Sequence, residues 1–390
     1  MRTRWGEPTR SCLAALMFLT ASARLIGQEG WTAKLKPEVN PDLKALPDNT
    51  WKRMQTRGDV FDHPKTEVGL VYDERIGGVV YFGGCSAGYC NSVWLYHVGS
   101  NTWKEVMPWV KGREEKTGKP IGQCGYYAVY NSDLGLYFKH RGGSSTADGR
   151  GGRGRDSNTW TLDVRALAWR RVATGPHEGV GPDWPGAYCC YSLAYDRDAK
   201  VAILYGGLEE DRGTWAFDFQ QKKWKNLRPK TSPPPLFLHS MVYDSANKVT
   251  LLFGGQTGNY SAGKTVNETW SYSHARNIWE KRSPAKAPAP RAQAQACFDS
   301  VNGVMILLGG HAEVYPRRSE GRFYTDTWVY DYRADTWTEM KPAASPSSSA
   351  VRFMAFDPVN NVAVNVDGGG AKKQTWVYRY RKAKPLQQRE

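Results

Sequence analysis

The sequence has no apolar run long enough to cross a membrane as a helix. Its N-terminal run, Cys12 to Leu19, is well under the roughly 20 residues that a spanning helix needs. No CxxC pair and no cysteine–histidine cluster with zinc-like spacing is present, which argues against a structural zinc site. Acidic residues are fewer than basic ones, since the chain has 38 Asp and Glu against 53 Lys and Arg. We expect no metal and no cofactor.

The first residues have the pattern of a secretory signal peptide. Three arginines precede the apolar run, and Ala21-Ser22-Ala23 follows it as a small-residue cleavage site. We therefore expect residues 1–23 to be removed, leaving no transmembrane segment, and the mature protein to be secreted or periplasmic. The aperiodic residues 24–48 are interpreted as an N-terminal extension.

The formal net charge of +15 favours anionic partners, such as acidic glycans, cell-wall polymers or nucleic acid. A generally basic exported protein is the alternative interpretation, and export argues against nucleic acid. We expect an anionic glycan or a protein ligand as the partner, and a monomer as the state of the chain.

Removal of the signal leaves an even number of cysteines, which permits disulfides in an exported chain without establishing their pairing. Three schemes are open: a bridge between the adjacent Cys189 and Cys190, a bridge from Cys124 to either of them, and closure of the short loop from Cys85 to Cys90. The sixth, Cys297, precedes Phe298 in a predicted strand and is interpreted as a buried thiol.

A repeated segment organises the chain, with two tryptophans always nine residues apart. The complete copies are TWVYDYRADTW at Thr327 to Trp337 and the segments that begin at Trp94, Trp160, Trp215 and Trp270. A truncated copy, TWVYRY, lies at Trp376. Its alternating apolar residues have the period of two that places side chains on one face of a strand.

Each copy follows two further predicted strands. The first ends in an aromatic and a polar residue, at Val68 to Asp73, Tyr126 to Asn131, Tyr191 to Asp196, His239 to Asp244, Ala294 to Asp299 and Arg352 to Asp357. The second ends in paired glycines, at Gly84, Gly143, Gly207, Gly255, Gly310 and Gly369. Glycine there permits a positive φ or a close approach of backbone. A fourth strand carries the second tryptophan.

Four antiparallel strands repeated about every 50 residues describe a propeller blade. The paired glycines and the later tryptophan resemble kelch repeats, and the resemblance covers roughly residues 49–380. It implies an all-β, six-bladed kelch-type β-propeller, with residues 381–390 as a C-terminal tail. Asn49-Thr50-Trp51-Lys52 copies Asn101-Thr102-Trp103-Lys104, so we expect an N-terminal strand to complete the last blade and close the ring.

The resemblance also indicates where to look for binding residues, because kelch-like blades place their two-to-three loops and inter-blade connections on one face. These loops are long after Gly143, Gly255 and Gly310. Guanidinium groups bind carboxylate, sulfate or phosphate through paired donors, and solvated loop arginines are the structural alternative. The candidates are Arg150, Arg153, Arg155, His311, Tyr315, Arg317, Arg318 and Arg322.

Two further candidates, His239 and Arg352, lie where the innermost strands begin. An ionisable group there needs a partner or a water-filled channel. Kelch-like propellers include oxidases that resemble galactose oxidase, bacterial sialic acid mutarotases and noncatalytic recognition proteins. No ordered two-His, two-Tyr set supports a copper oxidase. We favour a recognition module for an anionic glycan or a protein. A mutarotase or epimerase of acidic sugars, with His239 or His311 as proton carrier, is the alternative.

Overall fold

A computed structural model describes most of the chain, and every structural statement below concerns that part. The ranges are residues 30–59, 69–83, 92–108, 120, 128–143, 155–176, 181, 183–186, 190–207, 213–258, 263–312, 322–347, 354–367 and 374–382. No helix within these ranges is long and apolar enough to cross a membrane.

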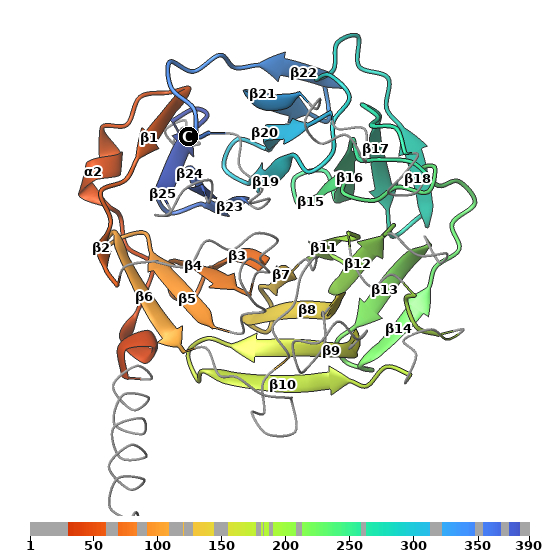
Figure 1. Ribbon diagram of the computed structural model, residues 1–390, viewed down its shortest axis with the longest axis horizontal. Coiled ribbons are helices and arrows are strands. Elements are labelled where there is room, and N and C mark those ends of the chain that lie inside the picture. The colour runs from red at the N-terminus through yellow and green to blue at the C-terminus, as the bar shows by residue number, and fades with distance from the viewer. Residues whose placement is uncertain are drawn as a thin grey trace, which may run out of the picture.

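The protein is an all-β propeller whose six antiparallel sheets surround a central channel (Figure 1). Blade 1 consists of β3 (Gly69–Asp73), β4 (Gly78–Phe82), β5 (Val93–His97) and β6 (Thr102–Met107). Blade 2 consists of β7 (Ala128–Asn131), β8 (Leu136–Gly143), β9 (Arg155–Asp163) and β10 (Ala168–Ala173). Blade 3 consists of β11 (Ser192–Asp196), β12 (Val201–Tyr205), β13 (Thr214–Asp218) and β14 (Lys223–Asn226). The prediction of four antiparallel strands per blade is confirmed.

The second half of the ring repeats this arrangement. Blade 4 consists of β15 (Ser240–Asp244), β16 (Val249–Phe253), β17 (Thr269–Ser273) and β18 (Ile278–Lys281). Blade 5 consists of β19 (Gln295–Asp299), β20 (Val304–His311), β21 (Phe323–Asp331) and β22 (Thr336–Glu339). Blade 6 consists of β23 (Met354–Asp357), β24 (Val362–Asp367), β25 (Gln374–Arg379) and β1 (Thr50–Arg53). The innermost strands begin one or two residues later than the sequence pattern predicts, and end where predicted.

The polar residue that ends each innermost strand forms the turn to the next strand. In blade 4, Asp244 accepts the backbone N–H groups of Ala246 and Asn247, both at 3.0 Å. In blade 5, Asp299 accepts those of Val301 and Asn302. Such side-chain turns explain why the aromatic residue at the end of the strand is followed by Asp or Asn.

The paired glycines let neighbouring backbone approach the end of the second strand. Gly254 and Gly255 have φ values of 67° and 100°, in the region that side chains rarely adopt. The N–H of Gly255 donates to the carbonyl of Arg291 at 2.9 Å. A Cβ on Gly254 would lie 2.6 Å from that same oxygen. The glycines therefore allow the connection between one blade and the next to pack against the end of the second strand.

The second tryptophan of the signature joins neighbouring blades. In blade 5 the indole N–H of Trp337 donates to the hydroxyl of Thr269 in blade 4 at 3.0 Å. Four other junctions repeat this hydrogen bond, for the pairs Trp51–Thr327, Trp103–Thr375, Trp224–Thr159 and Trp279–Thr214. The threonine always precedes the first tryptophan of the adjacent blade, so the signature encodes packing between blades.

The junction between blades 1 and 2 departs from this pattern. Val93 occupies the position of the threonine, and the buried indole N–H of Trp169 has no hydrogen-bond partner within the described ranges. Trp169 instead packs against Phe82, with ring centroids 4.6 Å apart. Apolar contact alone joins the tryptophan to its neighbour at this junction, whereas the other five junctions add the indole–threonine hydrogen bond.

Replacement of Thr269 by valine should lower the free energy of unfolding by about 1–3 kcal/mol, because it leaves the buried indole N–H of Trp337 unsatisfied. Val93→Thr is the matched variant, since it offers Trp169 the missing acceptor and should not destabilise. Urea unfolding of both variants measures the difference. Equal destabilisation by the two substitutions would contradict the role of the threonine.

The ends of the chain meet in blade 6, as the sequence predicts (Figure 1). Strand β1 pairs antiparallel with β25, and Trp51 lies opposite Tyr378. The two rings pack in a tilted arrangement with centroids 4.9 Å apart, and Trp51 is 4% exposed. Trp51 thus supplies the second tryptophan that the truncated copy at Trp376 lacks.

Residues 30–48 form a strap across the propeller before β1, including the short helix α2 (Pro41–Lys44). The hydroxyl of Thr32 donates to blade 2 at the carbonyl of Arg165. Asn40 is 2% exposed and binds two blades, because its amide donates to the carbonyl of Val98 and its backbone N–H to Asn360. The strap therefore joins blades 2, 1 and 6.

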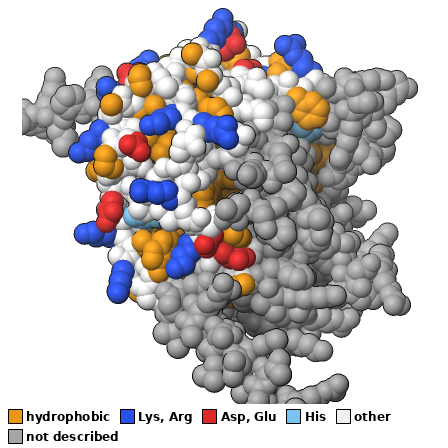
Figure 2. All heavy atoms as spheres, turned by 60° about the vertical axis from the view of Figure 1, so that its left-hand side comes forward, with side chains coloured by type: hydrophobic (Ala, Val, Ile, Leu, Met, Phe, Trp, Pro, Cys, Tyr) orange, Lys and Arg blue, Asp and Glu red, His pale blue; other side chains and the backbone are white. Residues whose placement is uncertain are grey.

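One buried arginine of blade 6 anchors the strap. The guanidinium of Arg379, which is 6% exposed, donates to the carbonyls of Leu43 and Leu46 at 2.8 Å each. After β1 the chain adds β2 (Arg57–Gly58), parallel to β6 on the outside of blade 1. Figure 2 views this side of the molecule, where Lys and Arg side chains are scattered among fewer acidic ones.

Candidate functional site

The antiparallel topology gives the propeller two unlike faces. One, here called the turn face, carries the tight turns that join the first strand to the second and the third to the fourth. The strap lies on it, through its bonds to Val98 and Asn360. The opposite loop face carries the two-to-three loops and the inter-blade connections. Segments of variable length therefore gather on the face that the strap leaves open.

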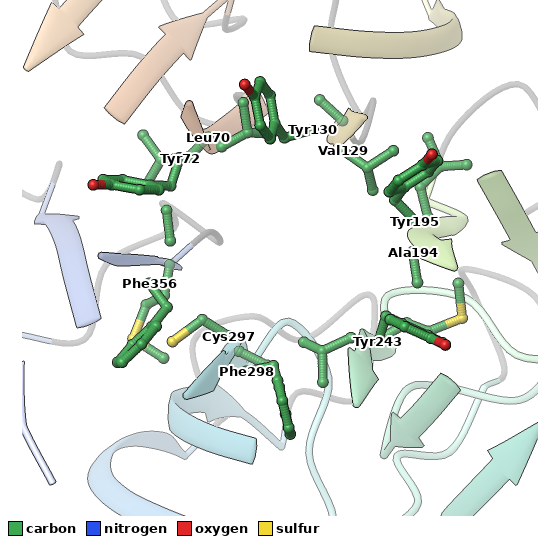
Figure 3. A pocket seen from close by; sticks show the side chains of 18 of the residues that line it. Leu70, Tyr72, Val129, Tyr130, Ala194, Tyr195, Tyr243, Cys297, Phe298 and Phe356 are labelled. Carbon is green, nitrogen blue, oxygen red and sulfur yellow. The ribbon is translucent and has the colours of Figure 1, made fainter. Parts of the chain in front are cut away.

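The central channel holds a cavity of about 250 Å³ that is lined by apolar side chains together with serines and the ionisable Glu74, Arg197 and His239. Figure 3 shows the rings of Tyr72, Tyr130, Tyr195 and Tyr243 directed away from the open centre. The hydroxyls of Tyr130, Tyr195 and Tyr243 donate to aspartates of the preceding blade. The tyrosines therefore join blades and do not present hydroxyls to the channel.

His239 is the titratable group of the channel wall that sequence reasoning selected, and the structure places it there. It is 2% exposed, and neither ring nitrogen has a hydrogen-bond partner within the described ranges. Its ring lies 5.6 Å from that of Tyr205. Burial lowers the pKa of His239 to about 3, so the imidazole is neutral near pH 7. A side chain that resists protonation this strongly is a poor proton carrier.

The stability of the protein should depend on pH through His239. The folded pKa of about 3 lies below the unfolded value of about 6.5, so the unfolded state binds the extra proton. Stability should fall by up to about 1.4 kcal/mol per pH unit as the pH decreases below about 6.5.

Urea unfolding of the wild type and of His239→Phe between pH 4 and pH 8 tests this prediction. The variant should lose this part of the pH dependence. It should be at least as stable at low pH, because no hydrogen bond of the imidazole is removed. An identical pH profile for the two proteins would contradict the assignment.

His311 is not among the described residues that line the channel cavity. It ends β20, is 7% exposed, and exchanges backbone hydrogen bonds with Ala292, the connection into blade 5. Arg322 is exposed at the start of β21, with its guanidinium 5.2 Å from the ring centre of Tyr324. Arg155 begins β9, and its side chain lies outside the described part. The structure therefore does not bring His239 and His311 into one site.

Several predicted residues lie outside the described ranges. They are Arg150, Arg153, Tyr315, Arg317, Arg318, Arg352, Cys85, Cys90, Cys124 and Cys189, together with the signal segment 1–23 and residues 383–390 of the tail. Cys190 is buried. The prediction of a buried thiol is confirmed for Cys297, which is free and 4% exposed.

Sequence reasoning missed a buried ion pair on the loop face. Arg291, 1% exposed, binds Asp326 through two nitrogens at 2.6 and 2.9 Å. It also donates to the carbonyls of Ala289 and Gly309, and its guanidinium stacks 4.0 Å from the ring centre of Tyr324. The pair ties the connection between blades 4 and 5 to the end of the long loop after Gly310. No repeat signal marks Arg291.

His140 has a structural role in blade 2. Its strand shows a shift of register between His140 and Gly142, which marks a β-bulge. Its Nδ1 lies 2.9 Å from the hydroxyl of Thr159, and its ring packs 4.6 Å from that of Trp224. Within the described ranges, no three His, Cys, Asp or Glu side chains lie together as metal ligands.

Comparisons with known proteins agree with this architecture. Residues 140–369 match the domain family described as "KLHDC2/KLHL20/DRC7 Kelch-repeats domain". The chain is 32% identical over 120 residues to dynein regulatory complex subunit 7 of Chlamydomonas reinhardtii, a match covering 29% of this chain and 10% of that protein. It is 23% identical over 259 residues to mouse multiple epidermal growth factor-like domains protein 8, covering 65% and 8%.

A third match, to kelch-like protein 41a of Danio rerio, is 23% identical over 181 residues, covering 46% of this chain and 27% of the relative. The chain thus spans about a quarter or less of the length of these relatives. None of the three names refers to galactose oxidase or to a mutarotase.

Proposed function

Because the chain belongs to the kelch-repeat family, we propose that it is a noncatalytic recognition propeller that binds a partner protein through its loop face. One observation carries this proposal: the strap covers part of the turn face and leaves open the face that carries the variable loops. The described channel wall supports recognition over catalysis, since His239 is held neutral there.

The charge of the chain narrows the class of partner. A net charge of +15 favours an acidic surface or segment, because complementary charge accelerates encounter and excludes like-charged proteins. The same charge supports an anionic glycan as the second candidate ligand. Secretion or a periplasmic location, which the N-terminal signal suggests, would bring the propeller into contact with such glycans. An epimerase or mutarotase would need a proton carrier other than the neutral His239.

Substitutions on the two faces distinguish these roles. Proteins that bind the wild-type propeller in an extract of its native organism are first identified by cross-linking and mass spectrometry. The variant Arg317→Ala/Arg318→Ala should no longer bind them. A turn-face variant, Lys200→Ala/Lys248→Ala, should keep them. Loss in the turn-face variant alone would overturn the assignment of the loop face.

A glycan array with the same two variants tests the second candidate. Binding of acidic glycans that depends on Arg317 and Arg318, without any captured protein, would replace a protein by a glycan as the ligand. NMR of sugar anomer exchange covers the enzyme alternative, and a rate equal to that of buffer would exclude mutarotation.

A further inference from the structure

The outermost strand of each blade has one edge directed away from the ring, and the described chain covers two of these edges. In blade 1 the carbonyl of Trp103 accepts the N–H of Asp59 at 2.9 Å. In blade 4 the N–H of Trp279 donates to the carbonyl of Thr231 at 3.4 Å, and the hydroxyl of Thr231 bonds the carbonyl of Trp279. The tryptophan of the fourth strand therefore turns its backbone groups outward.

Strand β14 of blade 3 has the same register and an uncovered edge. Trp224 lies opposite Phe217 as Trp279 lies opposite Tyr272, so its N–H and C=O point outward as well. Within the described ranges no residue bonds to either group. Figure 1 shows β14 on the outside of the ring. An uncovered edge of this kind can pair with a strand from another chain.

The charge around this edge is mainly positive, although Asp218 lies opposite Lys223 in the ladder. Five exposed cations lie within nine residues, namely Lys222, Lys223, Lys225, Arg228 and Lys230. None forms a salt bridge with an acidic residue of the described chain. Lys223 and Lys225 flank the buried Trp224 and share one face of the strand. Two of the other uncovered edges differ: β22 ends in Glu339, and β10 has a register shift after Arg171.

We propose that β14 is a second docking site, which takes an extended acidic segment of a partner protein by strand addition. The outward N–H and C=O of Trp224 pair with the backbone of the added strand. Acidic side chains at alternate positions of that strand repeat with the spacing of Lys223 and Lys225, since both strands share a period of two. This site is separate from the loop face, and neither assignment depends on the other.

Other anionic partners fit the edge less well. Trp224 is 4% exposed and offers no ring on which bases of a single strand could stack. The exposed large apolar residues of the described chain are Val39, Leu134, Val301, Phe323 and Val359, all outside this segment, so nothing here would enter a membrane. A purely structural role for these lysines is to prevent two propellers from pairing through this edge. If that were their only role, the edge would not bind an acidic strand.

The test uses fluorescence anisotropy with a labelled peptide of alternating Glu and Thr, added to the full mature chain. Its partner probe has the same sequence with N-methyl groups on the amides of one edge, which keeps the charge and removes the pairing. We expect the N-methylated peptide to bind at least about tenfold more weakly. Equal binding of the two peptides, or no binding of either, would overturn strand addition.

Two protein variants locate the site. Lys223→Glu/Lys225→Glu should weaken binding of the unmodified peptide by at least about tenfold. Arg53→Glu/Lys264→Glu makes the same change of net charge at exposed residues elsewhere and should alter it by less than about twofold. Equal loss in the two variants would overturn the assignment to β14. Binding of heparin through Lys223 and Lys225, without binding of the peptide, would also overturn the proposal.

Discussion

Deletion of residues 24–55 is expected to abolish the cooperative unfolding transition of the propeller. The deletion removes four buried apolar side chains, Leu43, Leu46, Trp51 and Met54. Loss of each large buried side chain costs about 2–5 kcal/mol, so the sum reaches the roughly 5–15 kcal/mol that holds a typical domain folded. Thermal unfolding followed by circular dichroism measures the effect.

A synthetic peptide of residues 30–56 provides the control for this deletion. Because β1 pairs with β25 through four successive residues, the added peptide should occupy the empty edge and restore a cooperative transition in proportion to its concentration. The point variant Trp51→Ala should cost about 3–5 kcal/mol in the full chain. A truncated protein with an unchanged melting temperature would show that the ring closes without these residues.

Arg291→Met is expected to destabilise the protein by about 3–5 kcal/mol, because it leaves the carboxylate of Asp326 partly buried without its partner. The double variant Arg291→Met/Asp326→Leu should recover part of this loss, since no uncompensated charge remains. Denaturant unfolding of the single and double variants gives the coupling energy between the two side chains. A coupling energy near zero would contradict the importance of the pair.

The same pair should affect stability in acid. Burial acts to raise the pKa of Asp326, but the hydrogen bonds and charge of Arg291 outweigh it, and the pKa lies below its ordinary value. A depressed folded pKa means that the stabilisation is present above the unfolded pKa of about 3.9 and is lost as the pH falls through the folded value. The variant Asp326→Asn should lack this loss below about pH 4.

The blades could be predicted from the sequence because every unit repeats the same local chemistry. The spacing of Trp328 and Trp337, the glycine pairs and the polar residue at the end of each inner strand are short-range features that six copies reinforce. The closing strand could be predicted for the same reason, since Trp51 copies Trp103 and Trp376 lacks its second tryptophan.

The strap could not be predicted in this way. Residues 30–48 have no period, and the contacts of Asn40 and Arg379 go mostly to backbone carbonyls far away in the chain. Sequence patterns carry no information about such acceptors, because every residue has a carbonyl. The extension is therefore recognisable as part of the propeller only in the structure.

The candidate site could be predicted only in part, for a related reason. His239 was found because its position at the start of an inner strand is set by the repeat, and its place in the channel wall agrees. Arg291 lies in one blade connection, where no repeat marks an arginine, and the position of Asp326 in β21 does not by itself identify this partner. The low pKa of His239 depends on burial by residues from neighbouring blades, which only the fold brings together.

The central claim is that β1 and β25 join both ends of the chain in one blade and hold the loop face as a closed frame. Hydrogen–deuterium exchange with mass spectrometry on the folded protein tests it most directly. The amides of residues 374–379 and those of Thr50 and Lys52, which face β25, should exchange as slowly as those of β16 and β20, because they belong to one ladder. Rapid exchange of Thr50 and Lys52 in the folded protein would contradict the closure.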